Sequence, residues 1–193
     1  MNRLDPRSPL VLDTKDVGRR PGSMAELGRT VEAPADLGTD VISVREGQPI
    51  ELDLRLESVV EGVLVTGSAT AVATGACVRC LEPVEETLVV PFQELFAYAD
   101  RAAHHREVGA DDEETEEPRL VIDDLIDLEP LLVDSVVPAL PFQPVCRVDC
   151  PGLCSECGTP LAEDPDHHHD VIDPRWSALA ELAGSPRDEE KRK

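Results

Sequence analysis

Six cysteines are the residues of this chain best suited to chemistry, and they fall in two clusters. One cluster is Cys77-x2-Cys80, and the other runs Cys146-x3-Cys150-x3-Cys154-x2-Cys157. A structural zinc site takes four ligands, with Zn–S distances of about 2.3 Å, and two residues between cysteines let a tight turn aim both sulfurs at one point. The spacing therefore predicts a thiolate Zn²⁺ site, with a zinc knuckle at each Cys-x2-Cys pair.

Six thiolates exceed the four that one zinc ion takes, so the spacing leaves three ligand sets open. The second cluster can close a site alone, or Cys77 and Cys80 can join either Cys154 and Cys157 or Cys146 and Cys150. We favour a set that includes the first cluster, because closing a loop of about seventy residues stabilises a fold more than a local clip does. Reactive redox thiols and inert buried cysteines are the alternatives to metal.

Four thiolates around a divalent cation leave about two negative charges, which nearby cations and backbone N–H groups help to offset. Arg79 and Arg147 each stand inside a cysteine cluster and suit this role. The tract from 166 to 170 contains three consecutive histidines between acidic residues, and we expect it to be a solvated loop rather than a metal site.

The 193-residue chain is strongly acidic, with 40 acidic against 18 basic residues and a formal charge of -22. Such a surface repels phosphate and attracts basic partners. Neither an export signal nor a run of eighteen apolar residues is visible, so we expect no membrane span and a cytoplasmic location. In a reducing cytosol, cysteines bind metal more often than they form disulfides.

The elements that must position the cysteines are mostly strands. Apolar residues alternate with charged ones from Ile50 to Glu57, which predicts a half-buried strand, and 63–73 and 86–96 are its expected partners. Residues 128–137 carry apolar side chains at helical spacing, with Pro130 in the first turn. The predicted class is α+β and mainly β: a small antiparallel sheet or open barrel with a short helix and a zinc-knuckle C-terminal segment.

Composition divides the chain into three predicted regions. Residues 1–30 form an N-terminal arm with an edge strand at Pro9–Leu12 and a turn or helix start at Pro21-Gly22-Ser23. Residues 31–162 form a single β-rich domain, interrupted by a disordered acidic loop at 101–118. Residues 163–193 form a polar tail with a short helix that begins near Asp173.

The sequence carries no sign of an enzyme. It has no phosphate-binding Gly-Lys loop and no evident pairing of nucleophile and base, and a fully thiolate zinc site is closed. Direct RNA binding through the sheet is disfavoured, because residues 41–99 hold nine acidic residues against three basic ones. Contacts with RNA or another partner are assigned instead to four arginines: Arg19, Arg20, Arg79 and Arg147.

Three stretches carry a family resemblance: Pro9-Leu10-Val11-Leu12-Asp13, Cys77-Val78-Arg79-Cys80-Leu81, and the segment from Leu140-Pro141 to Gly158. In this order they resemble the YceD family of large ribosomal RNA accumulation proteins over residues 10–160. The resemblance implies a factor needed for normal levels of 23S ribosomal RNA, with a metal site and no assigned catalysis. It also implies Cys77, Cys80, Cys146 and Cys150 as the shared ligand set.

The resulting hypothesis is a non-enzymatic zinc-binding factor in large ribosomal subunit biogenesis. It acts as an adaptor for a basic large-subunit ribosomal protein or for precursor 23S rRNA, without a small-molecule substrate. The competing hypotheses are a direct RNA-binding protein, separable by the salt dependence of binding, and a thiol-redox sensor, which requires reactive cysteines of low pKa.

Overall fold

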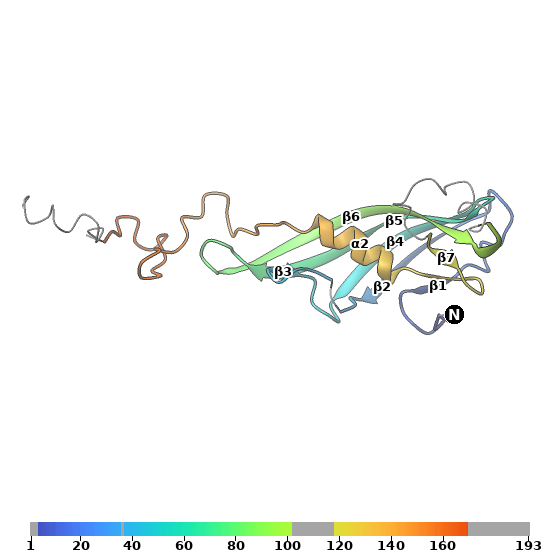
Figure 1. Ribbon diagram of the computed structural model, residues 1–193, viewed down its shortest axis with the longest axis horizontal. Helices are drawn as coiled ribbons and strands as arrows, with labels where there is room; N and C mark the ends of the chain where they lie inside the picture. The colour runs from blue at the N-terminus through green and yellow to red at the C-terminus, as the bar shows by residue number, and fades with distance from the viewer. Residues whose placement is uncertain (1–3, 36, 102–117, 170–193) are drawn as a thin grey trace, which may run out of the picture. The chain divides into compact units, whose positions relative to one another are not determined.

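The computed structural model describes residues 4–35, 37–101 and 118–169, which are coloured in Figure 1. The chain forms two compact units, Met1–Val148 and Asp149–Lys193. The predicted acidic loop, apart from its end residues 101 and 118, and the predicted helix near Asp173 lie outside the described residues.

A mainly β, open sheet dominates the first unit, as the sequence predicts (Figure 1). Its strands are β2 (Met24–Glu32), β3 (Ile42–Ser43), β4 (Pro49–Ser58), β5 (Gly62–Ala76), β6 (Pro83–Tyr98) and β7 (Leu120–Val121). They follow the order β2-β4-β5-β6-β7, with β3 paired to β5. All pairings are antiparallel except that of β6 with β7.

The alternation in β4 gives the sheet one buried and one exposed face. Ile50, Leu52, Leu54 and Leu56 are buried, whereas the charged residues between them are exposed or half-buried. Because side chains alternate between the faces of a strand, this pattern fixes the register of the neighbouring strands as well.

The prediction for the residues after Pro21-Gly22-Ser23 is wrong where it allows a helix start. Met24 begins β2, which pairs with β4 over nine residues and places Leu27 beside Leu54. Cross-strand packing of this kind outweighs weak local signals at a sheet edge.

Helix α2 (Glu129–Ala139) confirms the predicted short helix and lies against β6 (Figure 1). Its Leu131, Leu132 and Val136 are buried. Pro130 stands in the first turn, where no N–H is needed. The helix ends before Leu140, which is extended because Pro141 follows it. No helix in the described ranges is long and apolar enough to cross a membrane.

The predicted N-terminal strand forms, but it pairs outside the main sheet. β1 (Val11–Asp13) is antiparallel to β8 (Leu125–Asp127), and the amide of Leu128 donates to the carbonyl of Leu10 at 3.0 Å. Since β8 leads directly into α2, this pairing fixes the start of the helix against the common core.

Candidate metal centres

The first knuckle, Cys77–Glu82, is the loop that joins β5 to β6. The amide of Cys77 donates to the carbonyl of Glu82 at 2.8 Å, and the amide of Leu81 donates to the carbonyl of Cys77 at 2.9 Å. Leu81 has φ +64°, a left-handed conformation that glycine adopts more readily than leucine does. These bonds close the turn and set Cys77 and Cys80 on the same side of it.

The chain after α2 runs beside this knuckle. The amide of Val78 donates to the carbonyl of Pro144 at 2.9 Å, and the guanidinium of Arg79 donates to the carbonyl of Val148 at 3.2 Å. Both bonds join β-hairpin residues to a segment almost seventy positions later in the sequence. These two hydrogen bonds hold the segment that carries Cys146 beside the first knuckle.

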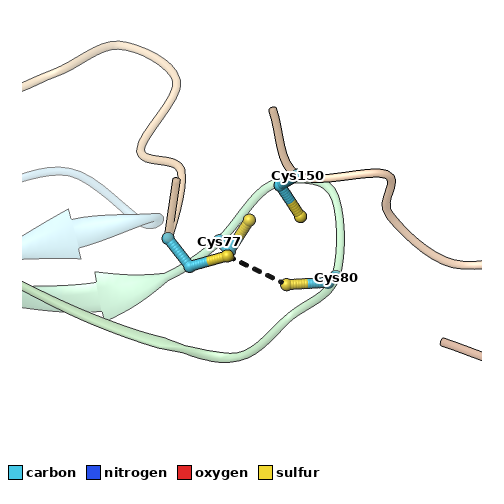
Figure 2. Close-up of side chains that lie close together, drawn as sticks. Cys77, Cys80 and Cys150 are labelled. Atoms are coloured by element: carbon cyan, nitrogen blue, oxygen red, sulfur yellow. Dashed lines mark hydrogen bonds between the residues drawn. The ribbon is translucent and has the colours of Figure 1, made fainter. Parts of the chain in front are cut away.

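Four cysteines converge at this place: Cys77, Cys80, Cys146 and Cys150, whose sulfurs all lie within 4.8 Å of one another. The sulfurs of Cys80 and Cys146 are 3.6 Å apart. Figure 2 shows the side chains of Cys77, Cys80 and Cys150 pointing toward one another. Of the three ligand sets left open by spacing, the structure assembles the one that the family resemblance implies.

The environment of Cys77 favours its thiolate. Its side chain is fully buried, and burial raises the pKa of the thiol. Backbone hydrogen bonds at Cys146, Arg79 and Cys80 outweigh this effect and, with the Cys80 side chain, lower the pKa of Cys77 to about 6. The thiolate is the form that binds a metal, so a pocket of backbone donors around a buried sulfur fits a metal ligand.

All six cysteines lie in the described part of the chain, and none forms a disulfide there. A group of four thiolates can hold one soft or borderline divalent ion, and zinc is the common ion for tetrahedral S₄ sites. Four protein ligands leave no open coordination position. The chemistry that the first group offers is therefore structural cross-linking.

The remaining two cysteines belong to a second group in the second unit. Cys154, Cys157, His167 and His169 place their ligand atoms within 4.8 Å of one another. Nε2 of His167 lies 3.1 Å from Sγ of Cys157, and Nε2 of His169 lies 3.2 Å from it. The side-chain and backbone groups of Thr159, and then His169, lower the pKa of the Cys157 thiol to about 6.

The expectation that the histidine tract is only a solvated loop is wrong for His167 and His169, which face Cys157. The sequence contains a signal for them in the spacing Cys154-x2-Cys157-x9-His167-x-His169. The spacing of the cysteines alone does not reveal it, because the two histidines lie outside the cysteine cluster. His168 differs, since its ring contacts the backbone carbonyl of Asp166.

The four arginines proposed as partner contacts do not form one surface. Arg79 and Arg147 are exposed at the first cysteine group, whereas Arg19 stacks over the ring of Tyr98 at 4.6 Å and pairs with Asp124. Tyr98 is the last residue of β6, whereas the first knuckle directly precedes this strand. The sixteen residues of β6, at about 3.3 Å each, separate Arg19 from the first cysteine group by roughly 50 Å. Arg20 is exposed beside Arg19.

The strained turn of the first knuckle yields a stability prediction. Leu81 is 67% exposed, so replacing it removes little packing, whereas its left-handed backbone costs about 1–2 kcal/mol. We expect Leu81→Gly to raise the free energy of unfolding by about 0.5–1 kcal/mol, after the greater unfolded-state freedom of glycine is subtracted. Urea denaturation followed by circular dichroism measures it. Val78→Gly is the control and should be destabilising; a loss in both variants would contradict a strained Leu81.

The chain is similar to known proteins over most of its length. Residues 65–183 match the family described as "Large ribosomal RNA subunit accumulation protein YceD". An uncharacterized protein of Mycobacterium tuberculosis (strain H37Rv) is 50% identical over 183 residues, which cover 94% of this chain and 84% of that protein. One from Mycobacterium leprae is 45% identical over 177 residues, covering 91% and 78%. No solved structure matches.

Proposed function

The chain belongs to the YceD family, and from this membership we propose that it supports accumulation of 23S ribosomal RNA as a non-enzymatic, zinc-stabilised adaptor for a basic large-subunit ribosomal protein. The family description names large ribosomal RNA accumulation and no reaction. A closed four-thiolate group is suited to holding a fold together, and a zinc ion there needs no further ligand.

The observation that carries the adaptor proposal is the acidic face of the sheet, defined by Glu26, Glu51, Asp53 and Glu57 with Arg55. Cross-strand register places them together, because Glu26 pairs with Arg55 and Gly28 pairs with Asp53. Arg55 is the basic residue among them, and Glu57 accepts a hydrogen bond from it at 3.1 Å. The carboxylates of Glu26, Glu51 and Asp53 therefore lie outside the Arg55–Glu57 ion pair.

The acidic face is shallowly hollowed. A depression of about 590 Å³ is lined by Glu26, Asp53, Arg55 and the small polar residues Thr66 and Ser68. Carboxylates and hydroxyls accept hydrogen bonds from lysine and arginine side chains, and small residues let a partner chain approach closely. The whole chain has a formal charge of -22, so this face attracts a basic protein and repels the phosphates of bare RNA.

Charge reversal on the acidic face tests the adaptor proposal. We expect Glu51→Lys/Asp53→Lys to weaken binding of a purified basic large-subunit ribosomal protein by at least tenfold at 0.1 M salt, since both carboxylates are lost and two like charges are added. Titration followed by fluorescence anisotropy, with each candidate protein in turn, measures the affinity. Wild-type affinity should fall steeply as salt is raised.

The matched control is Asp40→Lys/Glu46→Lys, which makes the same change of charge at exposed positions in the turns around β3. It should retain most of the wild-type affinity. Equal losses in the two variants would assign binding to net charge rather than to the acidic face. Binding of bare 23S precursor RNA without any ribosomal protein, abolished by Arg79→Glu/Arg147→Glu, would replace the adaptor with a direct RNA-binding protein.

A further inference from the structure

Beyond the proposed function, we infer that Cys154, Cys157, His167 and His169 form a second, independent zinc site that folds the start of the second unit, so that the chain takes two zinc ions with different ligand sets. Tetrahedral coordination with Zn–S near 2.3 Å and Zn–N near 2.0 Å sets ligand atoms roughly 3.3–3.8 Å apart. The sulfur of Cys157 lies 3.1 and 3.2 Å from the two imidazole nitrogens, close to that range.

The second knuckle, Cys154–Thr159, repeats the backbone of the first. The amide of Cys154 donates to the carbonyl of Thr159 at 2.8 Å, and the amide of Gly158 donates to the carbonyl of Cys154 at 2.9 Å. Gly158 has φ +75°, at the position that Leu81 occupies in the first knuckle. Two sequences that share the cysteine spacing thus adopt the same hydrogen-bonded turn, which presents a pair of thiolates to one ion.

The two histidines are oriented as ligands usually are. Their Nε2 atoms lie 2.9 Å apart and both lie near the sulfur of Cys157, so three potential ligand atoms converge on one point. Nδ1 of His167 lies 3.5 Å from a carboxylate oxygen of Asp164. A metal-bound histidine commonly donates its other ring N–H to a carboxylate, which fixes the tautomer and the ring orientation.

The fold of this region lacks an apolar source of stability. Among residues 149–169, all of which are described, Cys150 and Gly152 are buried and the rest are half-buried or exposed. Yet the backbone is organised: Leu153 pairs with Pro160, and the amide of Leu161 donates to the carbonyl of Gly152 at 3.0 Å. Segments this short need disulfides or a metal to hold a fold, and no disulfide is found in the described residues.

Zinc stoichiometry tests the inference on the full chain, purified without chelator and measured by native mass spectrometry. We expect two zinc ions in the wild type, one in His167→Ala/His169→Ala, and two in His168→Ala. His168 is the control from the same tract, because its ring contacts the carbonyl of Asp166 and is not among the four grouped ligands. Asp164→Asn should keep the ion but weaken its affinity about 10–100-fold, because only the orientation of His167 is lost.

Hydrogen exchange gives a second readout that does not depend on counting ions. Amides from Gly152 to Leu161 should be protected in the wild type and in His168→Ala, and exchange freely in the double histidine variant, while the sheet stays protected in all three. The same number of zinc ions in the wild type and in the double histidine variant, or equal losses in the double variant and in His168→Ala, would overturn the second site. Neither result touches the first group, so the proposed function stands or falls separately.

Discussion

Replacing Cys77 with serine is expected to lower the free energy of unfolding of the first unit by about 4 kcal/mol. Sulfurs of Cys80 and Cys146 come together across 66 residues of chain, and a covalent link closing a loop of that length stabilises a fold by about 4 kcal/mol through the unfolded state. A zinc cross-link acts on the same loop, and serine is a poor zinc ligand. Urea denaturation with zinc present, followed by far-ultraviolet circular dichroism, measures the loss.

Val78→Ser is the matched control for Cys77→Ser, because Val78 stands in the same turn and is 41% exposed. It should cost less than about 1 kcal/mol, since surface substitutions away from special features have small effects. Adding a chelator should lower the free energy of unfolding of the wild type to that of Cys77→Ser. In Cys77→Ser, the chelator should remove no further stability through the first group. If wild type and Cys77→Ser unfold at the same urea concentration in zinc, the first group is not a cross-link.

The second large effect is expected at the helix that leads to Cys146. Leu132 is fully buried in the core between α2 and the sheet, and Leu132→Ala should cost about 2–5 kcal/mol from lost burial and the cavity left behind. Val133→Ala, where the side chain is only partly buried, should cost less than half as much. The same denaturation assay measures both. A loss at Leu132 no larger than at Val133 would mean that α2 does not cover the core.

Local periodicity predicts the central elements of the fold. Apolar and charged residues alternate over positions 50–57 because β4 has a neighbouring strand on each side and one face in the core. Helix α2 can also be predicted, since Pro130 suits the first turn of a helix and the buried leucines have helical spacing. β2 is not, because it lies at the sheet edge and buries little of its own length. Its pairing depends on Leu54 and Ile50, which are distant in sequence and invisible to a local pattern.

The sequence predicts thiolate metal chemistry but cannot assign the ligands. Two Cys-x2-Cys pairs of identical spacing compete for the same partners, and the choice depends on where the chain after α2 runs. The bond from Val78 to the carbonyl of Pro144 decides it by placing Cys146 beside the first knuckle. His167 and His169 were missed because their polar neighbours resemble a solvated loop, and only the folded turn brings them to Cys157.

We propose that Cys77, Cys80, Cys146 and Cys150 hold one zinc ion. X-ray absorption at the zinc edge can identify the ligands of this ion in the Cys154→Ser/Cys157→Ser variant purified without chelator, since that variant keeps the first group alone. We predict one zinc ion per chain with four sulfur neighbours at about 2.3 Å and no nitrogen or oxygen in the first shell. A folded variant without zinc, or with nitrogen or oxygen ligands, would contradict a four-thiolate zinc site at these cysteines.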